Sequence, residues 1–281
     1  MTTPLLAPLR PAATVVVLRP AAAAPFEVLL VRRSDQVAFM AGAHVFPGGR
    51  VDDPDRPEPA DACDGLDTLG RCVDLAPHEE APYRVAAIRE LLEEAGVLLA
   101  RGPHGMADAV TAASVRAAVP PHTSLVAHLA TRGLRVALDA VMPFAHWVTP
   151  EIEIRRFDTR FLLARLPEGQ VASHDAGETT ALDWLTPQEA LARCARGEIK
   201  LPPPTWITLT RLAKFGSIAE AWQWASSTPI VRVQPGFVRQ HGTALVMLPG
   251  DPTYPLPPGC EPLEVTRFEL TEGGGWRPVR S

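Results

Sequence analysis

Continuous apolar runs in the first part of the chain predict β-strands. Two runs rich in Val and Leu, 14–19 and 26–32, are typical of strands joined by a proline-bounded turn over 20–25. Further extended segments are expected at 147–166, at 181–185 and, as short strands with turns, from residue 229 onward. The strand signals are therefore spread along most of the chain.

The clearest helix is expected over 82–95. Its apolar residues recur at helical spacing, which gives one stripe for a core, and Gly96 follows as a C-terminal cap. The stripe consists of Val85, Ile88, Leu92 and Ala95. Further helical patterns lie within 106–132 on both sides of Pro120-Pro121, after Thr186-Pro187 and over 205–215. Because helices and strands are interspersed, the pattern predicts an α/β or α+β domain with a mixed sheet.

Two segments show no periodic pattern. Residues 1–12 are rich in proline and are expected to form a loose N-terminal arm. Residues 52–80 are rich in Asp, Pro and Gly and are expected to form a loop insertion. The composition is otherwise that of a globular protein, with 46% hydrophobic and 21% charged residues among 281, so the chain can bury a sizeable core.

The charge and the cysteines narrow the classes of function. A formal net charge of −5 argues against a general nucleic-acid binder, which needs a basic face. No run of ~18 uncharged apolar residues is present, so no membrane span is expected. None of the 4 cysteines belongs to a C-x-x-C pair, which favours free thiols in a cytoplasmic protein. Only Lys200 and Lys214 are lysines among 27 basic residues, a bias typical of a high-GC bacterial genome.

The residues that carry chemistry lie at the end of the 82–95 helix. Glu90, Glu93 and Glu94 are spaced i, i+3 and i+4, so their carboxylates share one helix face. Like charges at these spacings repel by roughly 0.2–0.5 kcal/mol per pair, and the C-terminal end of a helix disfavours anions. A divalent cation would remove both costs, and oxygen ligands suit Mg²⁺ or Mn²⁺. The alternative is a solvated acidic face in which Arg89 pairs with Glu93.

A glycine pair upstream favours the metal interpretation, because Gly48-Gly49 allows close backbone approach and leaves carbonyls free as ligands. GG followed by REUxEExGU, where U is apolar, resembles the Nudix box of the Nudix hydrolases. The nine residues 89–97, with sequence RELLEEAGV, match this pattern in full. The 40 positions from Gly49 to Arg89 are more than the family pattern has, which indicates an insertion.

One further Glu of the family box has no direct equivalent here. Counted back from Arg89 its place falls on Ala81, and counted forward from Gly49 it falls on Asp55. The other acidic residues that could substitute for it are Glu79, Glu80, Asp52 and Asp53. The sequence leaves this choice open.

The insertion is similar to that of one branch of the superfamily, the long coenzyme A diphosphatases of the animal mitochondrial and peroxisomal type. Other stretches that resemble this branch are LLVRRS at 29–34, GAHVFPGG at 42–49, AIRELLEEAGVLL at 87–99, HWVTP at 146–150, RRFDTRF at 155–161 and LPPPTW at 201–206. The resemblance covers 13–215, and 216–281 form a strand-rich C-terminal extension. It implies a Nudix αβα sandwich with a mixed sheet and a helical insertion at 106–132.

The resemblance also implies roles for individual residues. Glu93, Glu94 and the Gly49 carbonyl would hold Mg²⁺ or Mn²⁺, Glu90 would be a further ligand or the general base, and Arg89 would hold the carboxylates by ion pairs. A distant carboxylate often joins such a site. Glu178 is the candidate here, with Asp175 and Asp183 as substitutes, and an ordinary exposed acid is the alternative for Glu178.

Substrate contacts are expected from basic and aromatic residues near these motifs. The candidates are Arg33 and Arg156 for phosphates, with Arg32, Arg155 and Asp158 beside them, and Phe46 and Trp147 for stacking on a base. Strand-edge ion pairs and core packing are the alternative roles.

The resemblance implies hydrolysis of a nucleoside diphosphate linked to another moiety. Coenzyme A or acyl-coenzyme A, cleaved to 3′,5′-ADP and a phosphopantetheine, is the first expectation. The same chemistry on ADP-ribose, a nucleotide sugar, a dinucleotide or a nucleoside triphosphate is the second, and a non-catalytic nucleotide sensor is the third. The expected partner is a small diphosphate, with no nucleic acid and no membrane, and a homodimer is possible.

Overall fold

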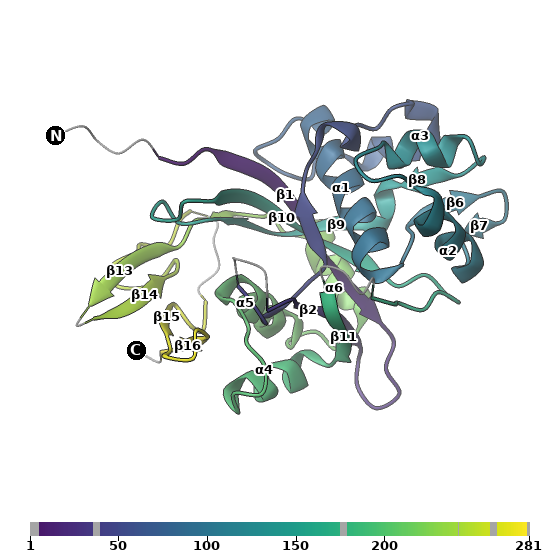
Figure 1. Ribbon diagram of the computed structural model, residues 1–281. Helices are drawn as coiled ribbons and strands as arrows, with labels where there is room; N and C mark the ends of the chain where they lie inside the picture. Colours follow the sequence, from purple (N-terminus) through teal and green to yellow (C-terminus); the bar gives the residue numbers. More distant parts are fainter. Residues whose placement is uncertain (1–5, 36–39, 175–178, 241, 259–262, 280–281) are drawn as a thin grey trace.

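A mixed eight-stranded sheet forms the centre of the molecule (Figure 1). The computed structural model describes residues 6–35, 40–174, 179–240, 242–258 and 263–279. The sheet contains β1 (Leu9–Arg19), β2 (Glu27–Arg33), β3 (His44–Val45), β4 (Gly48–Arg50), β9 (Val141–Val148), β10 (Arg156–Arg165), β11 (Thr179–Leu185) and β12 (Arg232–Val233). Its main order is β11-β2-β1-β10-β9-β12, with β3 paired to β2 and β4 to β1. The central pair β1 and β10 is parallel, whereas β10 and β9 are antiparallel.

Both faces of this sheet are covered. One face carries α1 (Pro77–Ala95), α2 (Ala109–Ala118) and α3 (Leu125–Ala130), with a small sheet of β5 (Cys63–Asp64), β6 (Ala100–Gly102), β7 (Gly105–Met106) and β8 (Arg135–Ala137). The other carries α4 (Pro187–Ala195), α5 (Pro203–Leu212) and α6 (Ile218–Ser227). Alternate residues of β1 enter different cores: Val15 and Val17 pack on the α1 side, and Val16 and Leu18 on the other. The expected αβα sandwich with a mixed sheet is confirmed.

Helix α1 begins earlier than its apolar stripe suggests. Pro77 occupies its first turn, and the Glu79 carboxylate accepts the Ala76 N–H at 2.9 Å. Pro82 lies inside the helix, which is why the pattern places the start five residues late. The helix ends at Gly96, whose left-handed φ of 67° and N–H bond to the Leu92 carbonyl form the expected cap.

Three expectations of secondary structure are corrected. Part of the supposed arm, from residue 9 to 12, is the start of β1, because Leu9 pairs with Arg156 of β10. The stretch 147–166 is two antiparallel strands with a turn between them, not one extended segment. The segment 52–80 is also more ordered than a loop. It holds three short 3-10 turns, the strand β5 and the first four residues of α1.

The C-terminal region is joined closely to the rest of the molecule. Helix α6, which the sequence pattern did not reveal, packs on the main sheet, and β12 adds a strand to it beside β9. A separate four-stranded sheet follows, made of β13 (Gly236–Gln240), β14 (Thr243–Met247), β15 (Arg267–Leu270) and β16 (Trp276–Pro278). Phe268 of this sheet meets Trp206 of α5 edge to face at 5.4 Å. Among the helices described, none is long and apolar enough to span a bilayer.

Candidate active site

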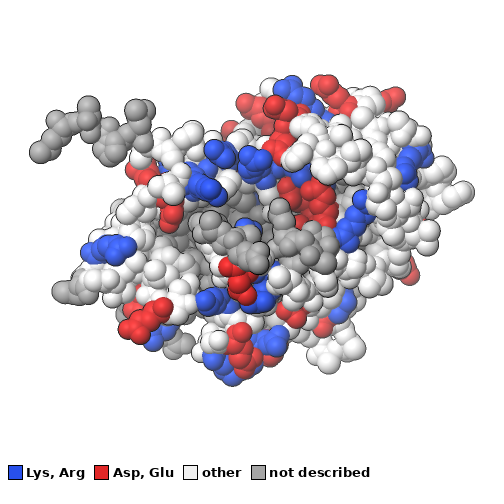
Figure 2. All heavy atoms as spheres, in the orientation of Figure 1, with Lys and Arg blue, Asp and Glu red and all other residues white. Residues whose placement is uncertain are grey.

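An acidic pocket opens where the C-terminal half of α1 meets β1 and β4. Glu90, Glu93 and Glu94 line it from the helix, and Gly49 lines it from β4. The turn between α2 and α3 and the segment before β10 complete its walls, around a space of about 1790 Å³ that is partly open to solvent. Figure 2 shows acidic side chains gathered at this part of the surface with basic side chains beside them.

Arg89 organises the carboxylates from the inner side of the pocket. Its Nε and one Nη bond to both oxygens of Asp55 at 2.8 and 3.0 Å, and its other Nη bonds to Glu90 at 2.8 Å and Glu93 at 3.0 Å. The Arg50 carbonyl accepts a further bond at 2.9 Å, so all five donors of the guanidinium are used. Burial disfavours the charge on Arg89, but the hydrogen bonds and ion pairs outweigh burial and raise its pKa.

Asp55 is, of the acidic residues considered for the missing Glu of the box, the one that contacts Arg89. It is 1% exposed, and it also accepts the Asp52 N–H at 2.8 Å. Ala81, the other position indicated by counting, has no polar group to offer. Glu80 lies in a separate cluster with Arg84. Of the two counts, the one forward from Gly49 falls on the residue that contacts Arg89, and only the structure distinguishes them.

Gly49 and Glu90 approach each other closely across the pocket. A methyl group at position 49 would overlap the Glu90 carboxylate, so any other residue there would displace this carboxylate. Burial raises the pKa of Glu90 to about 7, against the opposing effect of Arg89. Burial also raises the pKa of Glu93. The third carboxylate of the helix, Glu94, accepts the Gly48 N–H at 3.0 Å through one oxygen.

The donor set suits a hard divalent cation. Three carboxylates line one pocket together with Gly49, and carboxylate and carbonyl oxygens are the ligands that such a cation prefers. Within the described part of the chain, however, no three acidic, His or Cys side chains are gathered into a metal-binding group. The reason is visible in the contacts, because Glu90 and Glu93 face Arg89 while Glu94 faces Gly48. Ligation of one ion by all three would require these side chains to rotate.

The distant carboxylates fall elsewhere. Glu178 and Asp175 lie outside the described residues. Asp183 lies on β11, where its carboxylate is 3.3 Å from the His44 imidazole, and it does not line the acidic pocket. Asp183 is therefore paired with His44 and is not placed to join the carboxylates of the acidic pocket.

The predicted substrate residues divide between two cavities. Arg33 lines the acidic pocket and also an apolar cavity next to it. Phe46 and Trp147 are buried in the wall of the apolar cavity and do not line the acidic pocket. Arg156 lines neither, because its guanidinium bonds to the carbonyls of Thr149 and Ala7 at 3.3 Å. Its neighbour Arg155 lines the acidic pocket instead.

Arg32 and Asp158 also have local partners. Arg32 pairs with Asp35 at 2.8 Å, and Asp158 bonds to the His146 ring at 2.8 Å. Neither residue lines the acidic pocket.

Two ionisable residues of the acidic pocket, Arg50 and His122, were missed by sequence reasoning. Arg50 follows the glycine pair directly, which is the signal that could have identified it. His122 comes from the turn between α2 and α3 and has a left-handed φ of 59°, which is unusual for a residue other than glycine. The proline pair before it marks a turn, but only the packing of α2 and α3 against α1 brings that turn to the pocket.

The comparisons with known proteins agree with this geometry. A model described as the NUDT19 Nudix domain matches residues 68–212. The chain belongs to this family of Nudix hydrolases. It is 31% identical to the human acyl-coenzyme A diphosphatase NUDT19 over 84% of this chain and 74% of that protein, and 30% identical to the chicken protein of the same name over 83% and 74%.

A solved structure supports the same assignment. The Nudix hydrolase from Alicyclobacillus acidocaldarius is 31% identical, with a TM-score of 0.65 over 81% of this chain and 99% of that one. The Nudix family and its hydrolase activity, expected from the box, are thereby confirmed. The human and chicken relatives give no support to a bacterial origin, which stays a prediction from composition.

Proposed function

We propose that this Nudix hydrolase is a divalent-metal-dependent diphosphatase that cleaves coenzyme A or acyl-coenzyme A to 3′,5′-ADP and the corresponding phosphopantetheine. The observation that carries the chemistry is the acidic pocket, where Glu90 lies between Gly49 and Arg89 and shares one space with Glu93 and Glu94. The substrate class rests on the 31% identity to an acyl-coenzyme A diphosphatase.

In this proposal Glu93, Glu94 and the Gly49 carbonyl would hold Mg²⁺ or Mn²⁺. Such an ion neutralises the charge of a breaking pyrophosphate and makes a bound water more acidic. Glu90 accepts the proton from the water that attacks phosphorus as the bridging P–O bond breaks. Arg89 keeps the Glu90 carboxylate oriented through its 2.8 Å bond. Arg50 and Arg155 lie on the pocket wall, where guanidinium groups suit phosphate oxygens.

A hydrolysis assay tests the proposal directly. Coenzyme A, acetyl-coenzyme A, ADP-ribose, NADH, a UDP-sugar and dGTP would be incubated with Mg²⁺ or Mn²⁺, with and without a chelator, and the products identified. Release of 3′,5′-ADP from coenzyme A, its loss with the chelator and its loss in Glu90→Gln are expected. The substrate assignment would be wrong, and the reaction type right, if the only compounds hydrolysed were ADP-ribose, a nucleotide sugar, a dinucleotide or a nucleoside triphosphate. No turnover of the panel would favour a nucleotide sensor.

Two expectations from the sequence stay predictions. A homodimer would be tested by the mass of the protein in solution, and a cytoplasmic location by imaging of the tagged chain. The hydrolysis proposal depends on neither of them.

A further inference from the structure

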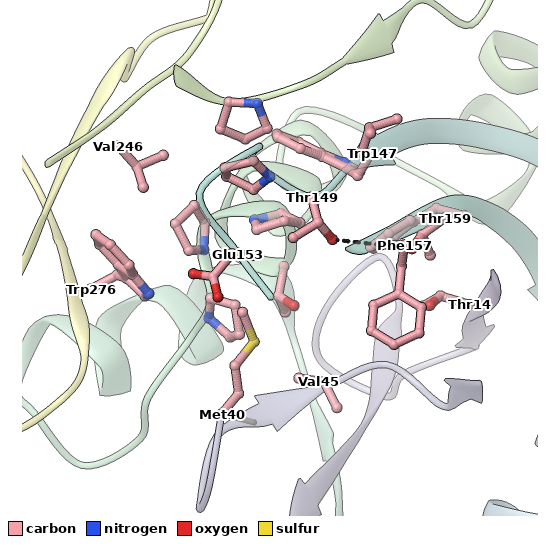
Figure 3. Close-up of a pocket in the computed structure, with 18 of the residues that line it drawn as sticks. Thr14, Met40, Val45, Trp147, Thr149, Glu153, Phe157, Thr159, Val246 and Trp276 are labelled. Atoms are coloured by element: carbon pink, nitrogen blue, oxygen red, sulfur yellow. Dashed lines mark hydrogen bonds between the residues drawn. The ribbon is translucent and has the colours of Figure 1, made fainter. Parts of the chain in front are cut away.

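A second, apolar cavity lies on the opposite side of β1 and β10 from α1. Its walls come from β3, the end of β9, the start of α5 and the C-terminal sheet, around a space of about 1110 Å³ that is partly open to solvent (Figure 3). Most of the side chains that face this space are aromatic, aliphatic or proline. Sites for small molecules are lined mostly by apolar and aromatic side chains with a few polar groups, so the lining of this cavity is that of a ligand site.

The apolar cavity adjoins the acidic pocket. Five residues line both spaces, and they belong to β1, β2, β4 and the first part of β10: Thr14, Arg33, Gly48, Phe157 and Thr159. Gly48 is the neighbour of the glycine that faces Glu90. A molecule whose diphosphate lies at the carboxylates can therefore extend past this shared wall into the apolar cavity.

The charges of the two spaces differ. In the described lining of the apolar cavity only Arg33 and Glu153 carry a charge, and Arg33 belongs to the shared wall. Figure 3 shows the Glu153 carboxylate pointing into the cavity. A 3′-phosphate would be repelled by this carboxylate, whereas an uncharged chain would not. The acidic pocket has Arg50 and Arg155 on its wall, which suits the phosphates of a nucleotide.

We propose that the apolar cavity holds the pantetheine arm and its acyl chain, while the 3′,5′-ADP half of the substrate stays on the arginine side of the acidic pocket. This inference rests on the proposed function and adds the orientation of the substrate. It also assigns a role to the C-terminal sheet, which supplies the cavity wall opposite β3.

The wall from the C-terminal sheet is built by three side chains. Phe237 of β13 and Val246 of β14 are direct partners in the ladder, so they lie side by side on one face of the sheet. Trp276 of β16 lies on the far side of the cavity from Phe157 and Thr14 in Figure 3. These three residues are specificity residues for the acyl chain, because they contact the occupant of the cavity and lie outside the acidic pocket.

Adjacent residues of β13 provide a matched pair of variants. Phe237 faces the cavity, whereas Val238 is 41% exposed and does not line it. The dissociation constants of S-octanoyl-pantetheine and of 3′,5′-ADP would be measured by calorimetry on the full chain without metal. The proteins compared are the wild type, Phe237→Ala and Val238→Ala. Val45→Phe, which narrows the cavity from β3, is a second variant in case Phe237→Ala unfolds.

The expected result is selective. Phe237→Ala and Val45→Phe raise the dissociation constant of S-octanoyl-pantetheine by about tenfold or more, the size expected for lost apolar contact in a pocket. The dissociation constant of 3′,5′-ADP stays within twofold of the wild-type value. Val238→Ala changes neither. Weaker binding of 3′,5′-ADP alone would place the nucleotide in the cavity and overturn the inference. Unchanged binding of both ligands would also overturn it. Failure of the proposed function would instead appear as absence of coenzyme A hydrolysis by the wild type.

Discussion

Helix α1 carries two buried arginines, and they show how similar ion pairs serve different purposes. Arg84 lies near the start of the helix, where its guanidinium bonds to the Glu80 carboxylate, to Thr68 and to the Leu138 carbonyl. Glu80 also accepts the N–H groups of residues 70–72 at 2.8–3.0 Å. Both side chains are completely enclosed, with 0% of each exposed. This cluster fastens the segment before α1 to the helix.

Arg89 lies five residues further along and has a comparable set of partners, but its cluster is open on one side. Asp55 closes the inner side, while Glu90 and Glu93 line the acidic pocket. The Glu90 and Glu93 carboxylates thus have room for a further partner, whereas both oxygens of Glu80 are already bonded within the protein. Access to the carboxylates, rather than the presence of an arginine, therefore distinguishes a candidate site from a structural ion pair.

The largest expected effect comes from the open cluster. Glu90→Gln keeps the size and removes the charge, so coenzyme A hydrolysis should fall by about 10³-fold, within the usual range for a general base. The melting temperature should change little, because Glu90 lies at the edge of a pocket. Initial rates and thermal melts of the two proteins would be compared. Activity within tenfold of the wild type would contradict the role given to Glu90.

The closed cluster should respond in the opposite way. Glu80→Gln leaves Arg84 buried without its counter-charge, and breaking such a pair costs about 3–5 kcal/mol of unfolding free energy. Urea unfolding at constant temperature measures this loss. The rate per folded molecule should stay unchanged, since Glu80 does not line the pocket. A loss of rate with unchanged stability would show that the two clusters are not separate.

Asp55 tests the link between stability and activity inside the open cluster. Asp55→Asn should lower hydrolysis by about 10–100-fold, the usual cost of removing a group that orients a catalytic or ligand carboxylate. Asp55→Glu, which restores the charge, should recover part of the rate. The pH–rate profile of Asp55→Asn should also shift, because Arg89 would then interact more strongly with Glu90. An unchanged profile would indicate that Asp55 only stabilises the fold.

The smallest effect is expected at the helix start. Glu79→Ala removes the carboxylate that accepts the Ala76 N–H and should destabilise the protein by about 1 kcal/mol, as loss of a cap does. Thermal unfolding would show a small shift, and hydrolysis should be unaffected. A large loss of hydrolysis would mean that the start of α1 contributes to the site.

Much of the open cluster was predictable because its signals are local. The spacing of Glu90, Glu93 and Glu94 places them on one helix face, and Gly96 fixes the end of that helix. The choice of Asp55 among several acids was not predictable, since its contact with Arg89 joins residues 34 positions apart. Likewise, Arg155 rather than Arg156 lines the pocket because Arg156 is held by two backbone carbonyls.

Periodicity, capping and a short motif act over a few residues. The amino-acid sequence was therefore sufficient to predict the acidic end of helix α1, the glycine pair, the strands around them and membership of the Nudix hydrolases. Which carboxylates remain accessible depends on the tertiary structure, which also places the acidic pocket beside an apolar cavity lined by residues of β13, β14 and β16. These features depend on contacts between residues far apart in the chain. Packing of the two layers and the C-terminal sheet against β1 and β10 creates them, and no local pattern encodes that packing.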